Sequence, residues 1–178
     1  MVPSPSKFIV DFNVQNKSQG KLVEQLIDKM ISLEDSFRKE LGKIVIYGDY
    51  HPENIIIRKL NSKTLEMIDF TDLAYGDPMM DLGTFIQQFD FMGHNFISRR
   101  QINEYKEFFV AAYFKKDFDK VAIENITRIN LYQAWTALRT AIFLFYMKDV
   151  ENPIADLLND CKNYLIAVED RKRIINLH

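Results

Sequence analysis

Three polar residues at short spacings carry the clearest chemical signature in this sequence. Asp49 and Asn54 lie at the two ends of one short segment, and Asp69 follows fifteen residues after Asn54. Asparagine and carboxylate oxygens are hard ligands of the kind that Mg²⁺ takes, and they leave positions for water and phosphate oxygens. A neighbouring carboxylate can accept the proton of an attacking hydroxyl group. The pattern therefore predicts metal-dependent phosphoryl transfer, with Asp49 as base and Asn54 and Asp69 on the metal.

The segments around these residues indicate how the three side chains meet. Three short runs flank them: two are rich in β-branched residues, at positions 44–47 and 55–57, and the third is mostly apolar, at positions 65–68. We expect a short strand, an ordered loop from Gly48 to Asn54, and then a β-hairpin with its turn at residues 61–62. Because a hairpin returns the chain to its starting point, Asn54 and Asp69 become neighbours in space.

An Asp followed five residues later by Asn is by itself a weak signal. The pattern occurs three times in this sequence, as Asp11/Asn16, Asp49/Asn54 and Asp90/Asn95. We expect the first pair in an irregular polar segment and the third at a helix end. Only the middle pair is framed by β-branched runs and followed by a hairpin that ends in Asp-Phe, so it is the candidate site.

A third motif extends the pattern. After Tyr47-Gly48-Asp49 with Asn54, and after Ile68-Asp69, the sequence continues to Gly76-Asp77-Pro78 and Asp81-Leu82. In this order and at these spacings, the motifs resemble those of the aminoglycoside phosphotransferase and choline kinase-like family, which shares the protein-kinase fold. That family carries His-Gly-Asp-x-x-x-x-Asn, then a hydrophobic residue and Asp, then Gly-Asp-Pro-x-x-Asp-Leu. The motifs cover residues 47–82.

The resemblance implies a role for each motif residue. Asp49 would be the catalytic base or hydroxyl-orienting carboxylate, and Asn54 and Asp69 would hold Mg²⁺ against the phosphates of ATP, the phosphoryl donor. Asp81 would brace the backbone of the catalytic loop. The alternative for Asp81 is an acid in the first turn of a helix that faces the helix dipole and has no further function.

Two residues of the loop depart from the motif or allow two interpretations. The histidine of the family motif is replaced by Tyr47, whose ring and hydroxyl can fill a position that serves packing and hydrogen bonding. His51 precedes Pro52 inside the loop, where it either shapes the loop or acts as a general base, because histidine titrates near neutrality. We group Tyr47, His51 and Asp81 as structural support of the site.

Outside the motifs the sequence predicts a mostly helical α+β chain. We expect an irregular segment over residues 1–18, a helix over 21–41 capped by Gly42, and helices from Asp77 to the end. We expect a single domain. Within it, residues 19–92 contain the preceding helix, the loop, the hairpin and the metal motif, and residues 93–178 form a helical region on the substrate side. The resemblance makes this the C-terminal lobe of a protein-kinase-like fold, with a small β-hairpin carrying the catalytic loop.

The glycine content bears on the other lobe of such a fold. None of the six glycines are spaced to form a phosphate-binding loop, and the 46 residues before Tyr47 contain no five-stranded region. We therefore expect that the N-terminal lobe is missing, and that the chain has little kinase activity alone. The uncovered face would be apolar, which allows self-association.

Composition limits the partners. The sequence has 178 residues, 47% of them hydrophobic, with 14 Phe and 8 Tyr, which is typical of a globular protein. The net charge of -2 and the pI of about 5.9 predict no nucleic-acid partner. The longest apolar stretch, residues 141–147, is too short to predict a membrane span. A single cysteine and an N-terminus without signal-peptide features favour a cytoplasmic location.

Several functions fit these observations. The leading hypothesis is the catalytic lobe of an ATP-dependent kinase that phosphorylates a hydroxyl of a small molecule, which is aminoglycoside-, choline- or sugar-like. A non-catalytic binding or regulatory module of the same fold is the alternative. A Mg²⁺-dependent phosphohydrolase is weaker, because such enzymes draw on more carboxylates or histidines. Glu151, Asp156 and Asp160 either face a cationic substrate or lie at the surface.

Overall fold

The computed structural model describes residues 5–15, 17–37, 44–59, 64–147 and 153–177. Its α-helices are α1 (Pro5–Gln15), α2 (Lys17–Phe37), α3 (Pro78–Gly93), α4 (Arg99–Phe114), α5 (Ile123–Tyr146) and α6 (Ile154–Glu169). Its strands are β1 (Ile44–Ile46), β2 (Ile55–Ile56), β3 (Glu66–Met67) and β4 (Ala74–Gly76), and two 3₁₀ turns are η1 (Pro52–Asn54) and η2 (Phe118–Lys120). The expectation of a mostly helical α+β chain is confirmed.

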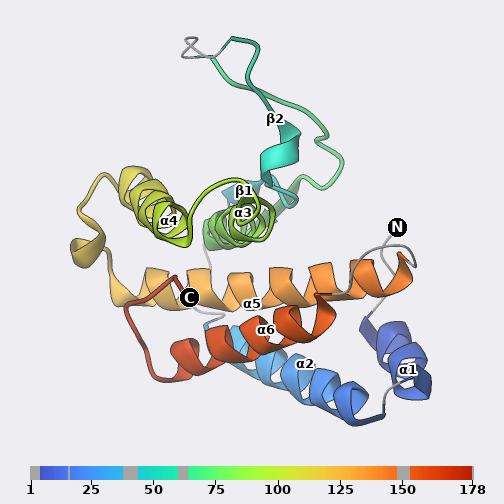
Figure 1. Ribbon diagram of the computed structural model, residues 1–178. Helices are drawn as coiled ribbons and strands as arrows, with labels where there is room; N and C mark the ends of the chain where they lie inside the picture. The colour runs from blue at the N-terminus through green and yellow to red at the C-terminus, as the bar shows by residue number, and fades with distance from the viewer. Residues whose placement is uncertain (1–4, 16, 38–43, 60–63, 148–152, 178) are drawn as a thin grey trace.

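Helix α5 is the centre of the molecule, with α3 and α4 on one side and α6, α2 and α1 on the other (Figure 1). One buried cluster joins α1, α2, α5 and α6, and a second joins α3, α4 and α5. Both clusters use α5, so this helix holds the two halves together. In the part of the chain that the structure describes, no helix combines the length and apolar character that crossing a bilayer requires.

The N-terminal segment differs from the expectation. An irregular segment over residues 1–18 is wrong for residues 5–15, which form α1. Pro5 is the first residue of that helix. At this position the backbone nitrogen needs no hydrogen-bond acceptor within the helix, and the fixed φ of proline suits a helix. Phe8 and Phe12 lie one turn apart, both buried, and their rings pack on Phe145 of α5 at 5.1 and 4.9 Å. This tertiary contact stabilises a helix that was not predicted from the sequence.

Helix α2 begins at Lys17, four residues before the predicted start. The prediction followed the apolar stripe that begins at Leu22, and a glycine disfavours helix interiors. Gly20 is buried, however, and a Cβ there would overlap the side chain of Asn13 on α1. Close packing of the two helices therefore explains a glycine inside α2. The predicted end at residue 41 and the Gly42 cap lie outside the described residues.

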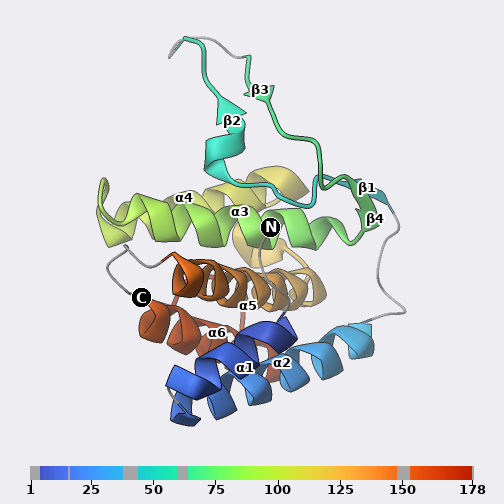
Figure 2. The same ribbon diagram turned by 90° about the vertical axis from the view of Figure 1, so that its right-hand side faces the viewer.

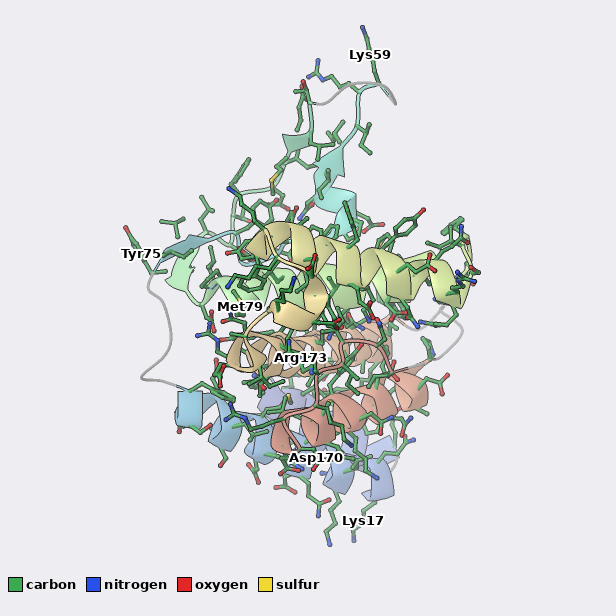
Figure 3. All side chains as sticks on the ribbon, turned by 90° about the vertical axis from the view of Figure 1, so that its left-hand side faces the viewer. Lys17, Lys59, Tyr75, Met79, Asp170 and Arg173 are labelled. Atoms are coloured by element: carbon green, nitrogen blue, oxygen red, sulfur yellow. The ribbon has the colours of Figure 1, made fainter. Side chains whose placement is uncertain are left out.

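Two small antiparallel pairs carry the loop and the hairpin. Strand β1 pairs with β4, with Val45 opposite Tyr75, and β2 pairs with β3, with Ile55 opposite Met67. The β2–β3 hairpin projects away from the helices (Figure 2), and Lys59 lies near its far end (Figure 3). The hairpin and the first strand agree with the prediction. Strand β4 was not predicted, because Ala74-Tyr75-Gly76 lacks a β-branched run. The predicted turn at residues 61–62 lies outside the described residues.

The helices after Asp77 begin where the capping residues predict. Asp77 caps α3 by accepting a hydrogen bond from the backbone N–H of Met79 at 3.0 Å, and Pro78 is the first helical residue. Ser98 and Gln101 form the capping box of α4. These caps fix where α3 starts, and α3 carries Asp81.

Gly83 allows a close crossing of α3 and α5. A Cβ at this position would lie 2.6 Å from the Cβ of Tyr132 and 2.8 Å from the carbonyl oxygen of Ile129. Gly83→Ala is expected to lower the free energy of unfolding by about 1–3 kcal/mol relative to Gly93→Ala, because overpacking forces the backbones apart. Gly93 is the matched control, since it ends the same helix and its Cβ would meet nothing nearer than 3.8 Å. Urea unfolding of the two variants measures the difference, and equal stabilities would show that the crossing tolerates a methyl group.

Candidate active site

The loop between β1 and β2 is anchored to helix α3 through one carboxylate. Asp81, in the first turn of α3, accepts hydrogen bonds from the backbone N–H of Tyr47 at 2.8 Å and of Gly48 at 2.9 Å. Bonds from an amide to an ionised carboxylate are stronger than neutral ones. Gly48 has φ +85°, and a Cβ there would overlap the carbonyl oxygen of Asp72. Asp81 and Gly48 together fix the path of the backbone that leads into Asp49.

Asn54 closes the loop at its other end. Its side-chain Nδ2 donates to the backbone carbonyl of Asp49 at 3.1 Å, and its backbone N–H donates to the carbonyl of His51 at 3.1 Å. Asn54 is buried and ends the turn η1. The Nδ2 bond orients the amide group so that Oδ1 points away from the Asp49 carbonyl. This oxygen stays available as an acceptor or a metal ligand.

The hairpin brings Asp69 back to the loop. The backbone N–H of Ile68 donates to the carbonyl of Asn54 at 3.1 Å, and the hydroxyl of Tyr47 donates to the carbonyl of Ile68. Asp69 is exposed, has φ 62°, and accepts a hydrogen bond from Thr71 Oγ1 at 2.7 Å. The backbones of Asn54 and Ile68 are thus hydrogen-bonded to each other. The two segments lie side by side, as predicted.

Tyr47 links the loop to the hairpin from inside. It is 7% exposed, and its ring lies 5.9 Å from the ring of Tyr50 and 5.4 Å from that of Phe70. Burial raises the pKa of Tyr47, and the nearby carboxylates, first Asp69, raise it further. Its hydroxyl therefore stays protonated at neutral pH and remains the donor to Ile68.

Asp49 makes two contacts with basic side chains. Its Oδ1 forms an ion pair with Nη2 of Arg139 on α5, and its Oδ2 lies 3.4 Å from Nε2 of His51. Sequence reasoning missed Arg139, which lies 90 residues from Asp49 in the chain. The available signal was its isolation, because Arg139 is the one charged residue among residues 129–146.

Asp49 lines a cavity of about 410 Å³ between the loop, α3 and α5, and His51, Glu53 and Arg139 also line it. Asp156 and Asp160, which the sequence offered for a cationic substrate, line a second cavity of about 280 Å³ between α3 and α6. Glu151 lies outside the described residues. The structure therefore does not bring Asp156 and Asp160 to the cavity of Asp49.

The oxygen atoms at Asn54 and Asp69 suit a magnesium ion. They supply an amide oxygen and a carboxylate, both hard ligands, and Mg²⁺ is commonly held by one or two carboxylates together with water and substrate phosphates. Within the described residues no group of three or more His, Cys, Asp or Glu side chains could hold a metal. Phosphate and water oxygens would thus have to complete the coordination, as expected for a metal that arrives with a nucleotide.

The part of the chain that carries this site matches a known protein family. Residues 10–123 match the phosphotransferase enzyme family, APH. The chain belongs to this family. The match contains all three motifs of the site, while Arg139, Asp156 and Asp160 lie beyond it. Neither a search of the curated proteins nor one of the solved structures found a match.

Family membership indicates an enzyme of the kinase type, and it agrees with the resemblance drawn from residues 47–82. The loop, the hairpin and Asp81 lie inside the part of the chain that matches the family. Arg139 on α5 and the second half of the cavity wall lie outside that part.

Proposed function

We propose that this chain carries the catalytic centre of an ATP-dependent kinase that phosphorylates a hydroxyl group of a small molecule. The observation that supports the proposal most is the single network that unites the site. Asp81 holds the loop backbone, Asn54 binds the loop at Asp49, and the hairpin returns Asp69 to Asn54. A base and two metal ligands in one network, within a phosphotransferase family member, are the parts that phosphoryl transfer needs.

In the proposed reaction, Asp49 orients the substrate hydroxyl and accepts its proton. Its Oδ2 serves this purpose, because Oδ1 is paired with Arg139. The hydroxyl oxygen forms a bond to the γ-phosphorus of ATP while the bond from that phosphorus to the oxygen of ADP breaks. Mg²⁺, when bound, neutralises charge on the phosphate oxygens. Asn54 Oδ1 and the Asp69 carboxylate would hold the ion.

The supporting residues keep these groups in place. Asp81 fixes the backbone before Asp49 through two amides, and Tyr47 fixes the hairpin through Ile68. His51 contacts Asp49 Oδ2 at 3.4 Å, which is long for a strong hydrogen bond. We propose that His51 shapes the loop and that Asp49, which the loop directs into the cavity, is the base.

We further propose that these 178 residues act as the C-terminal lobe of a kinase-like fold and transfer phosphoryl groups slowly by themselves. Such enzymes cover the ATP phosphates with a loop and hold them with a Lys–Glu pair. No glycine-rich loop occurs in this sequence. A version that includes any coding sequence upstream of Met1 is therefore expected to be more active than the 178-residue chain.

Removal of the metal tests the proposed reaction. Mg-ATP and a panel of hydroxyl compounds are incubated with the 178-residue chain and with the upstream-extended version, and phosphorylated product is measured by ³¹P NMR. Excess EDTA is expected to abolish product formation, and restored Mg²⁺ to recover it, because Asn54 and Asp69 need the ion to hold the phosphates.

The products separate the competing functions. Transfer to a hydroxyl supports the kinase, whereas release of inorganic phosphate alone supports a phosphohydrolase. Absence of both in the two versions, with the fold intact by circular dichroism, would contradict the proposed kinase and support a non-catalytic binding module.

A further inference from the structure

The carboxylate of Asp49 has few contacts that fix its orientation. The hydrogen bonds of Asn54 and Asp81 to the loop are made to backbone atoms, namely the carbonyl of Asp49 and the amides before it. They fix the path of the main chain but do not act on the Asp49 side chain. Among the described residues, Arg139 donates the one hydrogen bond that this carboxylate accepts. The nearest other donor is His51, whose Nε2 at 3.4 Å is too far for a strong hydrogen bond.

Arg139 reaches Asp49 from the central helix of the molecule. Helix α5 buries Ala137, Leu138 and Ala141 in the core and packs against α3 and α6, so the backbone around Arg139 is held in place. The side chains of the pair are 45% and 23% exposed, for Arg139 and Asp49. An ion pair with this exposure contributes little to the free energy of folding. The pair can therefore be removed with the fold intact, and its effect on the reaction can be measured separately.

The pair lies where the substrate hydroxyl has to approach the proposed base. Asp49 and Arg139 both line the cavity between the loop, α3 and α5. With Oδ1 held by the guanidinium, Oδ2 is the oxygen that remains for the hydroxyl. In phosphoryl transfer the protein contributes mainly positioning and electrostatic stabilisation, so the orientation of this carboxylate matters more than its strength as a base. A misplacement of about 1 Å near a reacting group can lower the rate by about 10²-fold.

We propose that Arg139 is a positioning residue, which holds the Asp49 carboxylate in the orientation that the substrate hydroxyl requires. The inference rests on the proposed kinase function. It adds to the site a residue that lies beyond the family match over residues 10–123. Asp49 itself compensates the charge of the guanidinium, so the pair needs no charged substrate to complete it.

The contact is tested first, without substrate, nucleotide or Mg²⁺. The 178-residue chain is prepared with ¹⁵N-labelled arginine, and the signal that disappears in Arg139→Met identifies the guanidinium of Arg139. We expect its rotation in the parent to be slow enough to resolve separate Nη signals, and we expect Asp49→Asn to abolish this resolution, because a neutral amide accepts a weaker hydrogen bond than a carboxylate. The same signals in the parent and in Asp49→Asn would overturn the inference.

Kinetics test the effect on the reaction, with the hydroxyl compound that gives the most product in the ³¹P NMR assay. Arg139→Met is expected to lower kcat by about 10–100-fold, which corresponds to the loss of one hydrogen bond to a charged group. The KM for ATP is expected to stay within about twofold of the parent, because the hydrogen bond of Arg139 is made to Asp49 and not to a proposed metal ligand. Arg139→Lys keeps one charged donor, and its kcat is expected to lie between those of the parent and Arg139→Met.

Arg100→Met is the matched control for these variants. Arg100 also lies on a helix, but its side chain is 88% exposed and pairs with Glu104 on α4. This variant is expected to keep the parent kcat. A parent-like kcat in Arg139→Met, or equal values in Arg139→Met and Arg139→Lys, would overturn the inference.

A double variant shows whether Arg139 acts through Asp49. If Arg139 orients the carboxylate, Arg139→Met causes no further loss of kcat in a chain that already carries Asp49→Asn, because the two changes remove the same interaction. A residue that bound the substrate or the phosphates directly would cause the same fold loss in both backgrounds. Equal losses would therefore contradict the positioning role.

Failure of the inference can be distinguished from failure of the proposed kinase, because the arginine signals are measured without any reaction. A guanidinium held by Asp49, with no phosphoryl transfer in either version of the chain, would support the orienting contact and contradict the kinase. Phosphoryl transfer that Arg139→Met leaves unchanged would support the kinase and contradict the inference.

Discussion

Asp49→Asn is expected to lower kcat for phosphoryl transfer by about 10²–10⁴-fold, because the substrate hydroxyl loses the carboxylate that accepts its proton. Asparagine keeps the size of the side chain and leaves the Asn54 bond intact, since that bond is made to the backbone carbonyl of residue 49. The KM for ATP is expected to change little, because Asp49 is not one of the proposed metal ligands. Initial rates with the parent and the variant measure the effect, in the version of the chain that shows the higher activity.

Asp117→Asn is the control for this experiment. Asp117 is exposed, pairs with Lys120, and lies between α4 and η2, far along the chain from the loop. Its replacement is expected to leave kcat within about twofold of the parent, as expected for an exposed surface pair of little energetic value. An Asp49→Asn variant with the same kcat as Asp117→Asn would show that Asp49 is not the base.

The largest effect on stability is expected from a buried ion pair on the other side of α3. Lys106 is fully buried, and its Nζ donates to Asp90 Oδ2 at 2.9 Å and to the hydroxyl of Tyr164 at 3.3 Å. Arg99 pairs with the other oxygen of Asp90. Asp90→Asn is expected to lower the free energy of unfolding by about 3–5 kcal/mol, because it leaves the buried ammonium group without the carboxylate that it contacts directly. Urea unfolding at pH 7 measures the loss, and Asp117→Asn again serves as the control, with an expected loss below about 1 kcal/mol.

The same pair predicts a pH dependence. Burial favours the neutral form of Asp90, but Lys106 and Arg99 outweigh it and hold the pKa of the carboxyl below its usual range. A carboxyl with a depressed folded-state pKa stabilises the fold at pH values above its unfolded pKa of about 3.9, and loses this effect as pH falls through the folded pKa. The stability difference between parent and Asp90→Asn is therefore expected to shrink from pH 7 to pH 3. A difference that stays constant over this range would contradict the ion-pair explanation.

Local features of the sequence predict the parts of the site that lie close together in the chain. Turn residues and β-branched runs within residues 44–69 predict a hairpin, and a hairpin brings its two ends together. The approach of Asn54 to Asp69 can therefore be predicted from the sequence. The contact of Asp81 with the loop could be predicted only from the family motif. An acid in the first turn of a helix does not by itself indicate which backbone amides it binds. Its two bonds to Tyr47 and Gly48 are contacts between elements that only the folded chain brings together.

The residues that sequence reasoning missed depend on tertiary packing. Arg139 reaches Asp49 only because α5 lies under the loop, and helical periodicity alone does not say which face meets which loop. The burial of Lys106 could have been predicted from the sequence. This residue lies four positions from both Ile102 and Val110, on the buried stripe of α4. A charged residue on an apolar stripe indicates a buried partner, which here is Asp90. Helix α1 was missed because its stability comes from Phe8 and Phe12 packing on α5.

A site-specific measurement of metal binding tests whether Asn54 and Asp69 hold the metal ion. Mn²⁺ can replace Mg²⁺, and its unpaired electrons broaden the NMR signals of nearby nuclei. Mn²⁺ is added with ATP to the 178-residue chain and to its Asp69→Asn variant, and the backbone amide signals are compared. We predict broadening centred on Asn54 and on residues 68–70 in the parent, and its loss in the variant. Broadening centred on Asp156 and Asp160, or broadening at residues 68–70 that Asp69→Asn leaves unchanged, would contradict the assignment of Asn54 and Asp69 as the metal ligands.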